Sequence, residues 1–201
     1  MGQRSQIYIK WNVSDNNKKR EGFIARYFQW NYGERMLSRA RGIIEHLEYY
    51  RKYPFTFNNT WNKKKLAMIA QTNFDMRDIA ATTDICKEYE EYGEGCAFED
   101  FVFYAQDNND GQLFIDVTDE GIKYALAMEW ANGYKAISPE EYMTDEACGN
   151  DWRKAAKEQE YLDYTEDNIK YITENATLMT DEEIANFIAD AERIYRSGGA
   201  V

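Results

Sequence analysis

The chain has 201 residues, a formal net charge of −12 and 44% hydrophobic residues. This length suits one domain that buries a core of its own. Because no run of about 18 apolar residues and no apolar signal-peptide stretch occurs, we expect neither a membrane-spanning helix nor a membrane partner. Only three cysteines occur and none forms a C-x-x-C pair, which is typical of a reducing compartment, so we expect a cytoplasmic protein.

The N-terminal part of the chain predicts a β-hairpin followed by a helix. Residues 3–11 alternate in hydrophobicity, and residues 23–28 return as a second strand after turn-forming Ser, Asp and Asn residues. A helix is expected to begin near Gly33, where Asn31 and Glu34 resemble a capping box. Its apolar residues recur at steps of three and four, as a buried helix face requires. They are Met36, Leu37, Ala40, Ile43, Ile44 and Leu47.

The middle of the chain predicts two short helices and three strands. The helices are expected over residues 61–71 and 84–92. The strands are expected over residues 101–105, 112–117 and 122–130, which alternate in hydrophobicity and are separated by turn-rich segments. Consecutive strands with short turns predict an antiparallel meander.

The C-terminal part predicts acidic helices. A short helix is expected over residues 139–144, a longer one from Asp151 and a terminal one from Asp181. Thr180 and Glu183 have the spacing of a capping box at the start of the terminal helix. This part of the chain therefore differs in character from the strand-rich middle.

Together these elements predict an α+β fold. We expect a single antiparallel sheet of about five strands with helices packed mainly on one face. We also expect a single domain over residues 1–201, with a sheet-containing core over 1–135 and an acidic helical part over 136–201.

The charge is distributed unevenly along the chain. Residues 1–70 carry +9, whereas residues 71–201 carry −21. An acidic surface repels nucleic acid and attracts basic surfaces, including those that hold DNA or RNA. We therefore expect no direct nucleic-acid binding and a partner protein with a basic surface. Solubility alone would explain the acidity equally well, and that alternative stays open.

No motif predicts catalysis, a metal site or a cofactor. His46, the single histidine, has no second His or Cys three or four residues away, as a zinc site would need. Residues 107–111, DNNDG, place glycine fifth rather than sixth and lack the later Glu of an EF-hand loop, so a hairpin turn is the better interpretation. No carboxylate pair stands out among 36 acidic residues. We expect a non-enzymatic protein.

A cluster of arginines and aromatic residues lies where the second strand gives way to the helix. The segment RYFQWNYGER, residues 26–35, combines rings that can stack on a base with arginines that can bind phosphate. The favoured alternative is that the rings cover the core and the arginines pair with the acidic part of the chain. The candidate ligand-binding residues are Arg26, Gln29, Trp30, Tyr32, Arg35 and Arg39.

Four segments of the chain are distinctive. They are MGQRSQIYIKWN, ARYFQWNYGERMLSRAR, TNFDMRDIA and AQDNNDGQLFIDV. Together they resemble an uncharacterised family of small proteins from prophages and mobile elements of Firmicutes, over most of the chain through about residue 130. The resemblance implies an accessory, phage-type gene product, and no activity or catalytic residue comes with it.

Two functions are compatible with these observations, and a virion or metabolic role stays open as well. In the first, a phage or mobile element encodes the protein as an inhibitor. Its acidic part occupies the basic nucleic-acid-binding surface of a host defence factor, such as a CRISPR effector or a nuclease, in the host cytoplasm. In the second, the arginine–aromatic cluster sequesters or cleaves a signalling nucleotide. A homodimer is compatible with either. The residues expected to contact the protein partner are Glu158, Glu160, Tyr161, Asp163, Tyr164, Glu166 and Asp167.

Overall fold

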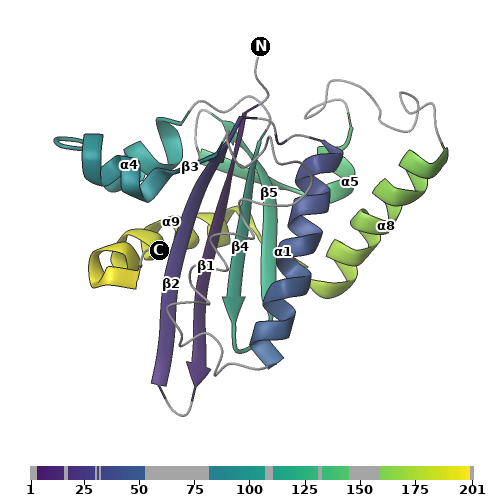
Figure 1. Cartoon of the computed structure of the whole chain (residues 1–201), viewed down its shortest axis with the longest axis horizontal. Helices are drawn as coiled ribbons and strands as arrows, with labels where there is room; N and C mark the ends of the chain where they lie inside the picture. The colour runs from purple at the N-terminus through teal and green to yellow at the C-terminus, as the bar shows by residue number, and fades with distance from the viewer. Residues whose placement is uncertain are drawn as a thin grey trace.

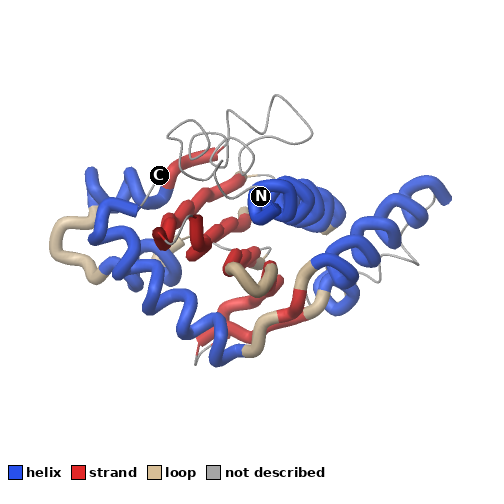
Figure 2. The backbone as a smooth tube through the Cα atoms, turned by 90° about the horizontal axis from the view of Figure 1, so that it is seen from below, coloured by secondary structure: helices blue, strands red, loops and turns tan. Residues whose placement is uncertain are grey.

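The fold is known from a computed structural model that describes residues 4–15, 18–29, 31, 33–52, 82–106, 111–130, 133–144 and 159–199. Over these ranges, a mixed β-sheet is covered by helices on both faces (Figure 1, Figure 2). The predicted α+β class is confirmed. Within the same ranges, no helix has both the length and the apolar character needed to cross a membrane.

Within the described residues the sheet has seven strands, in the order β3-β2-β1-β4-β5-β6, with β7 paired to β5 as well. Neighbouring strands are antiparallel except for β1 with β4 and β5 with β7, which are parallel. The strands are β1 Ser5–Asp15, β2 Lys18–Phe28, β3 Thr82–Asp84, β4 Gln112–Thr118, β5 Ile122–Trp130, β6 Gly133–Ile137 and β7 Thr177–Leu178.

The prediction of a five-stranded antiparallel sheet is therefore wrong in strand number and direction. Hydrophobic alternation predicts which residues share a face of a strand, but it does not specify which strands become neighbours. The hairpin β1–β2 and the antiparallel pairing of β4 with β5 were expected, whereas β6 was not predicted and the strand expected at 101–105 is helical. The parallel pair β1–β4 joins the two antiparallel parts into one sheet. Strand β7 comes from the part of the chain expected to be helical.

The helices lie on both faces of the sheet, whereas one covered face was predicted. Helices α1 and α8 contribute to one core cluster, and α4, η2 and α9 to the other. The reason is visible in β1, where the successive residues Ile7 and Tyr8 are both fully buried. A strand that is apolar on both sides needs a layer on each. The helices are α1 Glu34–Lys52, α4 Ile85–Tyr92, α5 Pro139–Tyr142, α8 Gln159–Asn175, α9 Asp181–Ile194 and the π-helical η2 Asp100–Tyr104 and η3 Tyr195–Gly199.

The first face of the sheet carries a mainly aliphatic core under α1. All six apolar positions predicted for the first helix are fully buried, and α1 begins directly after Gly33, as predicted. Trp11 lies in the same core. It is paired across the strands with Gly22, where a Cβ atom would stand only 1.9 Å from the Trp11 ring, so the indole requires glycine there.

The second face carries an aromatic core under α4, η2 and α9. The Tyr8 ring lies 4.7 Å from the Phe103 ring and 4.9 Å from the Phe114 ring, measured between centroids. The Tyr8 hydroxyl donates a 2.9 Å hydrogen bond to the Val102 carbonyl, so its polar end is satisfied inside the core.

One predicted strand is a helix. Residues 101–105 were expected to be extended, but η2 is π-helical over Asp100–Tyr104. Its aromatic residues have high strand propensity. However, Val102 and Phe103 are both fully buried against the second face of the sheet, whose strands are already paired with one another. Packing on that face overrides local propensity.

The remaining predictions concern individual strands, helices and helix caps. Strands β4 and β5 and helix α4 confirm the expected elements at 112–117, 122–130 and 84–92, and the capping box of Thr180 and Glu183 opens α9 as predicted. The Asn31 side-chain oxygen accepts a hydrogen bond from Arg39, and the capping box of Asn31 and Glu34 stays a prediction. The helix expected over 61–71 and the helix start at Asp151 lie outside the described residues.

Candidate functional site

Helix α8 lies against α1 at the edge of the fold (Figure 1). Its inner side includes the buried Thr165, Asn168 and Ile172. Arg41 on α1 donates to Asn168 Oδ1 at 3.1 Å, and its guanidinium lies 4.9 Å from the Tyr171 ring centroid. These contacts fix which side of α8 faces outward.

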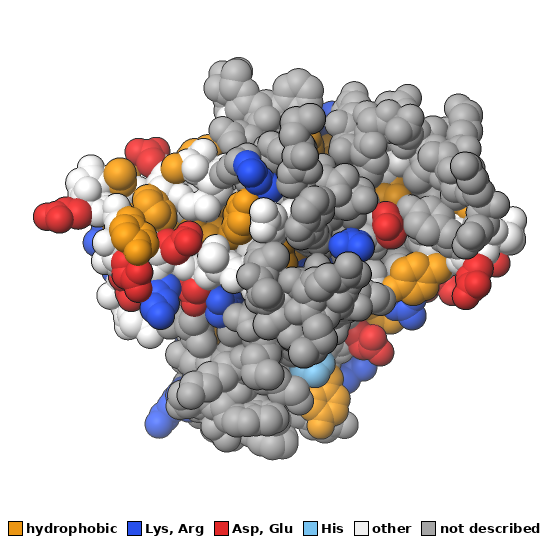
Figure 3. All heavy atoms as spheres, turned by 45° about the horizontal axis from the view of Figure 1, so that its top comes forward, with side chains coloured by type: hydrophobic (Ala, Val, Ile, Leu, Met, Phe, Trp, Pro, Cys, Tyr) orange, Lys and Arg blue, Asp and Glu red, His pale blue; other side chains and the backbone are white. Residues whose placement is uncertain are grey.

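The outer side of α8 is acidic. Glu160, Asp163, Asp167 and Glu174 are exposed, and their spacing of three, four and seven residues places them along one side of the helix. Glu166 is exposed as well, and Lys170 is the one cation of the helix. We call Glu160, Asp163, Glu166, Asp167 and Glu174 the α8 acidic face. Red side chains stand at the right-hand end of Figure 3, where α8 lies in Figure 1.

The carboxylates of this face are largely unused by the fold. Glu160, Asp167 and Glu174 form no ion pair with a cation in the described ranges. Asp163 accepts a 2.8 Å hydrogen bond from Gln159 on its own helix. Glu160, Asp167 and Glu174 are therefore available to meet a charged surface from outside.

The predicted partner-binding residues coincide in part with this face. Glu160, Asp163, Glu166 and Asp167 belong to it, whereas Glu158 and the Tyr161 side chain lie outside the described part of the structure. Tyr164 is 39% exposed, but its hydroxyl forms a 2.6 Å hydrogen bond with Ser38 on α1. The Tyr164 ring is therefore held at the border between α8 and α1. Glu174 was not among the predicted residues, although its helical spacing from Asp167 points to it.

Two arginines of the predicted arginine–aromatic cluster have partners inside the fold. Arg26 is buried and pairs with Asp84 at 3.3 Å. Arg39 is only 1% exposed, with its guanidinium 4.3 Å from the centroid of the Phe28 ring and its Nε donating to Asn31.

The other members of the cluster are placed differently. Gln29 is exposed and Arg35 is half-buried with contacts inside the protein, whereas Trp30 and Tyr32 lie outside the described residues. Arg26 also lines an open hollow with Thr83, Lys87 and neighbouring residues of β3 and α4. None of the other described members of the cluster lines it.

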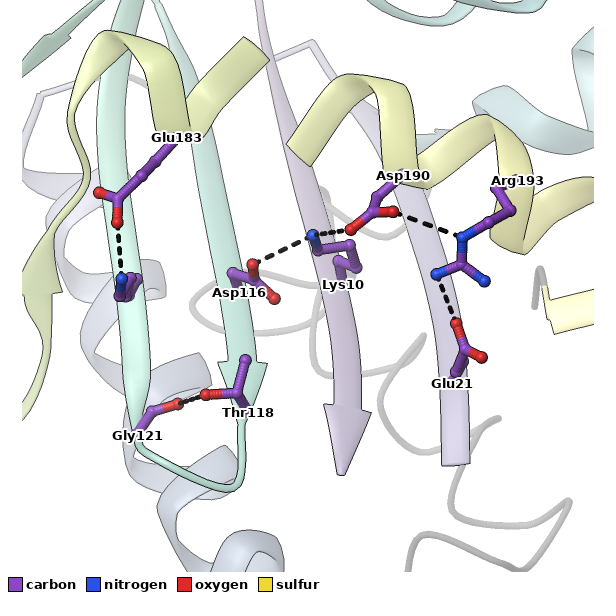
Figure 4. Close-up of polar contacts among 9 residues, drawn as sticks. Lys10, Glu21, Asp116, Thr118, Gly121, Glu183, Asp190 and Arg193 are labelled. Atoms are coloured by element: carbon purple, nitrogen blue, oxygen red, sulfur yellow. Dashed lines mark hydrogen bonds and ion pairs between the residues drawn. The ribbon is translucent and has the colours of Figure 1, made fainter. Parts of the chain in front are cut away.

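A second polar site lies between α9 and the sheet, and the sequence analysis did not find it. Lys10 on β1, Asp116 on β4 and Lys123 on β5 are cross-strand neighbours. The Lys10 side chain is 7% exposed, and its Nζ lies 3.1 Å from Asp116 Oδ2 and 3.2 Å from Asp190 Oδ2 on α9 (Figure 4). The available signal was a lysine within the otherwise apolar run IYIKW of β1.

A cavity of about 200 Å³ opens beside these contacts, and we call it the α9 cavity. Its charged lining comprises four carboxylates and two ammonium groups. They are Asp116, Glu120, Glu183 and Asp190, and Lys10 and Lys123. Lys123 pairs with Glu183 Oε1 at 2.6 Å, and Lys10 lies 5.0 Å from the centroid of the Phe187 ring.

The pKa values of two carboxyl groups that line the cavity are shifted in opposite directions. Burial raises the pKa of Asp116 above its ordinary value in spite of the neighbouring Lys10. Burial acts in the same direction on Asp190, but Lys10 and Arg193 together outweigh it and lower the pKa of that group. The difference follows exposure, since the Asp190 side chain is 49% exposed and that of Asp116 20%.

The described residues contain no group of three or more His, Cys, Asp or Glu side chains that could hold a metal ion. His46 is half-buried on α1 and already has contacts. The chain matches no protein-family model, no curated protein and no solved structure. The functional proposal therefore rests only on the geometry of the structure.

Proposed function

We propose that this protein is a non-enzymatic inhibitor, encoded by a phage or mobile element, that acts in the host cytoplasm. The α8 acidic face binds the basic nucleic-acid-binding surface of a host defence factor, a CRISPR effector or a nuclease. The observation that supports this most strongly is that Glu160, Asp167 and Glu174 on α8 are exposed and form no ion pair with a cation in the described ranges.

The physical basis is competition for a site built to hold a polyanion. A surface that binds phosphates with Lys and Arg gains much of its affinity by releasing counterions, and a rigid carboxylate row offers it an equivalent anion. Helix α8 is fixed on α1 by Arg41 and by the hydrogen bond between Ser38 and Tyr164, so its carboxylates are held in place. Preorganised charges lose little conformational entropy on binding.

The experiment is competition between this protein and nucleic acid for a defence effector. Purified protein is titrated against labelled DNA or RNA bound to each member of a panel of CRISPR effectors and defence nucleases. The α8 variant reverses Glu160, Asp163 and Asp167 to Lys. The control variant makes the same charge change at Glu91, Glu94 and Glu99, which are exposed and lie on the other face.

We expect the wild type and the control to displace nucleic acid from one effector and the α8 variant to fail. Raising the salt concentration should slow association, because exposed charges are screened beyond about 8–10 Å. Equal displacement by the α8 variant would move the interface elsewhere. No inhibition of any defence system, in the binding panel and in phage plating, would refute the proposal.

Nucleotide binding by the arginine–aromatic cluster is the weaker alternative. Arg26 and Arg39 are engaged within the fold, which supports the intramolecular role instead. The alternative is tested by melting the protein with a panel of nucleotides. A nucleotide that raises the melting temperature of the wild type but not of Arg35→Ala would revive it.

A further inference from the structure

The α9 cavity lies on the opposite face of the sheet from α8, so it is separate from the α8 acidic face. It is bounded by three adjacent strands below and by α9 above (Figure 4). Its residues come from β1, β4, β5 and the connections around them, as well as from α9. The proposed inhibitor function gives this cavity no role.

The charge of the cavity selects for cations. Its carboxylates outnumber its ammonium groups by four to two. Each ammonium is already held, Lys10 by Asp116 and Asp190, and Lys123 by Glu183. An entering anion would meet a net negative lining, whereas an entering cation would be attracted by it.

The Asp116 carboxylate is incompletely satisfied. Its Oδ2 accepts from Lys10, but its Oδ1 is buried and has no hydrogen-bond partner among the described residues. A buried carboxylate oxygen without a donor is costly. A donor group in the cavity would relieve that cost after a small rotation of the carboxylate.

The spacing of the carboxylates excludes a compact cation and favours an extended one. No three of them lie close enough together to hold a metal ion. Glu183 and Asp190 are seven residues apart on α9, which corresponds to about 10 Å along the helix axis. Between them lie Asn186 and the ring of Phe187, which also line the cavity. The Phe187 ring is only 1% exposed and Lys10 lies over it, whereas Asn186 is exposed. An alkyl chain that spans this distance passes Asn186, and charged groups at its two ends meet carboxylates.

We propose that the α9 cavity binds a short linear organic dication, a diamine or an amino-guanidine. One charged end lies near Glu120 and Glu183 at one end of the cavity. The other end donates to Asp116 and Asp190, and the alkyl chain lies along α9 past Asn186.

The test is isothermal titration with putrescine and agmatine as probes. Butane-1,4-diol is the neutral control of similar length, and succinate is the anionic control. We expect saturable one-to-one binding of the two cations, weaker at higher salt, and no binding of the diol or of succinate. Absence of binding by both cations would overturn the proposal, as would equal binding of the diol.

Three variants locate the site. Glu120→Lys reverses a charge of the lining, and Asn186→Trp fills the cavity from an exposed position. Glu182→Lys is the matched control, because Glu182 is exposed on α9 and does not line the cavity. Circular dichroism checks that each variant is folded.

We expect the first two variants to weaken agmatine binding at least tenfold and Glu182→Lys to leave it within twofold. If all three variants weakened binding equally, the effect would reflect overall charge and the site would be refuted. Unchanged binding in both Glu120→Lys and Asn186→Trp would place the cation elsewhere and refute it as well.

Discussion

The two faces of the sheet are closed in different ways. Under α1 the core is mainly aliphatic, with the side chains of Ile9, Ile43 and Leu113 fully buried. Under α9 the core is aromatic, and Lys10, Asp116 and Asp190 form a line of charges from the sheet to the helix. The first face therefore depends mainly on apolar burial, with the buried Arg39 over the Phe28 ring as a charged member. The second face also depends on how its charges are paired.

This difference distinguishes the charged residues that stabilise the fold from those that are exposed for binding a partner. Helix α1 contacts both the sheet and α8, and the carboxylates of Glu160, Asp167 and Glu174 on α8 are exposed. Helix α9 uses Glu183, Asp190 and Arg193 to reach the sheet, through Lys123, Lys10 and Glu21 respectively. Glu160, Asp167 and Glu174 are thus available to a partner, whereas much of the charge of α9 is used within the fold.

The largest effect is expected on the aliphatic face. Ile43→Asp places a carboxylate in a fully buried position of the aliphatic core. The cost should be several kcal/mol, enough to unfold a domain with a stability of about 5–15 kcal/mol. Circular dichroism and thermal melting measure it, with Tyr49→Asp at an exposed position of α1 as the control. A cooperative melt of Ile43→Asp near that of the wild type would contradict the account.

An intermediate effect is expected on the second face. Lys10→Met leaves Asp116 buried beside an apolar side chain and should lower the free energy of unfolding by about 3 kcal/mol. The double variant Lys10→Met with Asp116→Leu removes both charges and should recover most of that loss. Urea denaturation of the two variants and of Asp116→Leu completes the cycle. If the double variant were less stable than Lys10→Met, the charge pair would be a net source of stability and the account would need revision.

The smallest effect is expected at the start of α9. A hydrogen bond from Lys123 and one from the Thr180 backbone N–H lower the pKa of Glu183. A carboxyl group with a lowered folded pKa stabilises the protein above its unfolded pKa of about 4.3, and this contribution is lost as the pH falls through the folded pKa. Glu183→Gln should therefore cost about 0.5–1 kcal/mol at pH 7 and nothing at the acid end.

The measurement is urea denaturation of Glu183→Gln between pH 2 and pH 7. Glu182→Gln, at the exposed neighbouring position, is the control. The difference between wild type and Glu183→Gln should shrink as the pH falls below about 4. A difference that stayed constant with pH would assign the effect to the shape of the side chain and not to its charge.

Sequence patterns predicted the elements better than their arrangement. The three-and-four spacing from Met36 to Leu47 is a local property of one helix, and it was confirmed in full. The parallel pairing of β1 with β4 depends on residues about a hundred positions apart, which no local period encodes. The strand predicted over 101–105 failed because its side chains pack on a face that only the assembled sheet creates.

The candidate sites were predictable to a similar degree. Helical spacing and charge pointed to Glu160, Asp163 and Asp167, and the structure places all three on the exposed side of α8. The α9 cavity could not be found in this way, because Lys10 and Asp190 come together only when α9 docks on the sheet.

The central claim is that the α8 acidic face, and no other acidic surface, meets the partner. The most direct measurement compares two variants of equal net charge for displacement of nucleic acid from the inhibited effector. One carries Lys at positions 160, 163 and 167, and the other carries Lys at positions 91, 94 and 99. The account predicts that only the first loses displacement, by at least a hundredfold in effective concentration. Equal loss in the two variants, or loss in the second alone, would contradict it.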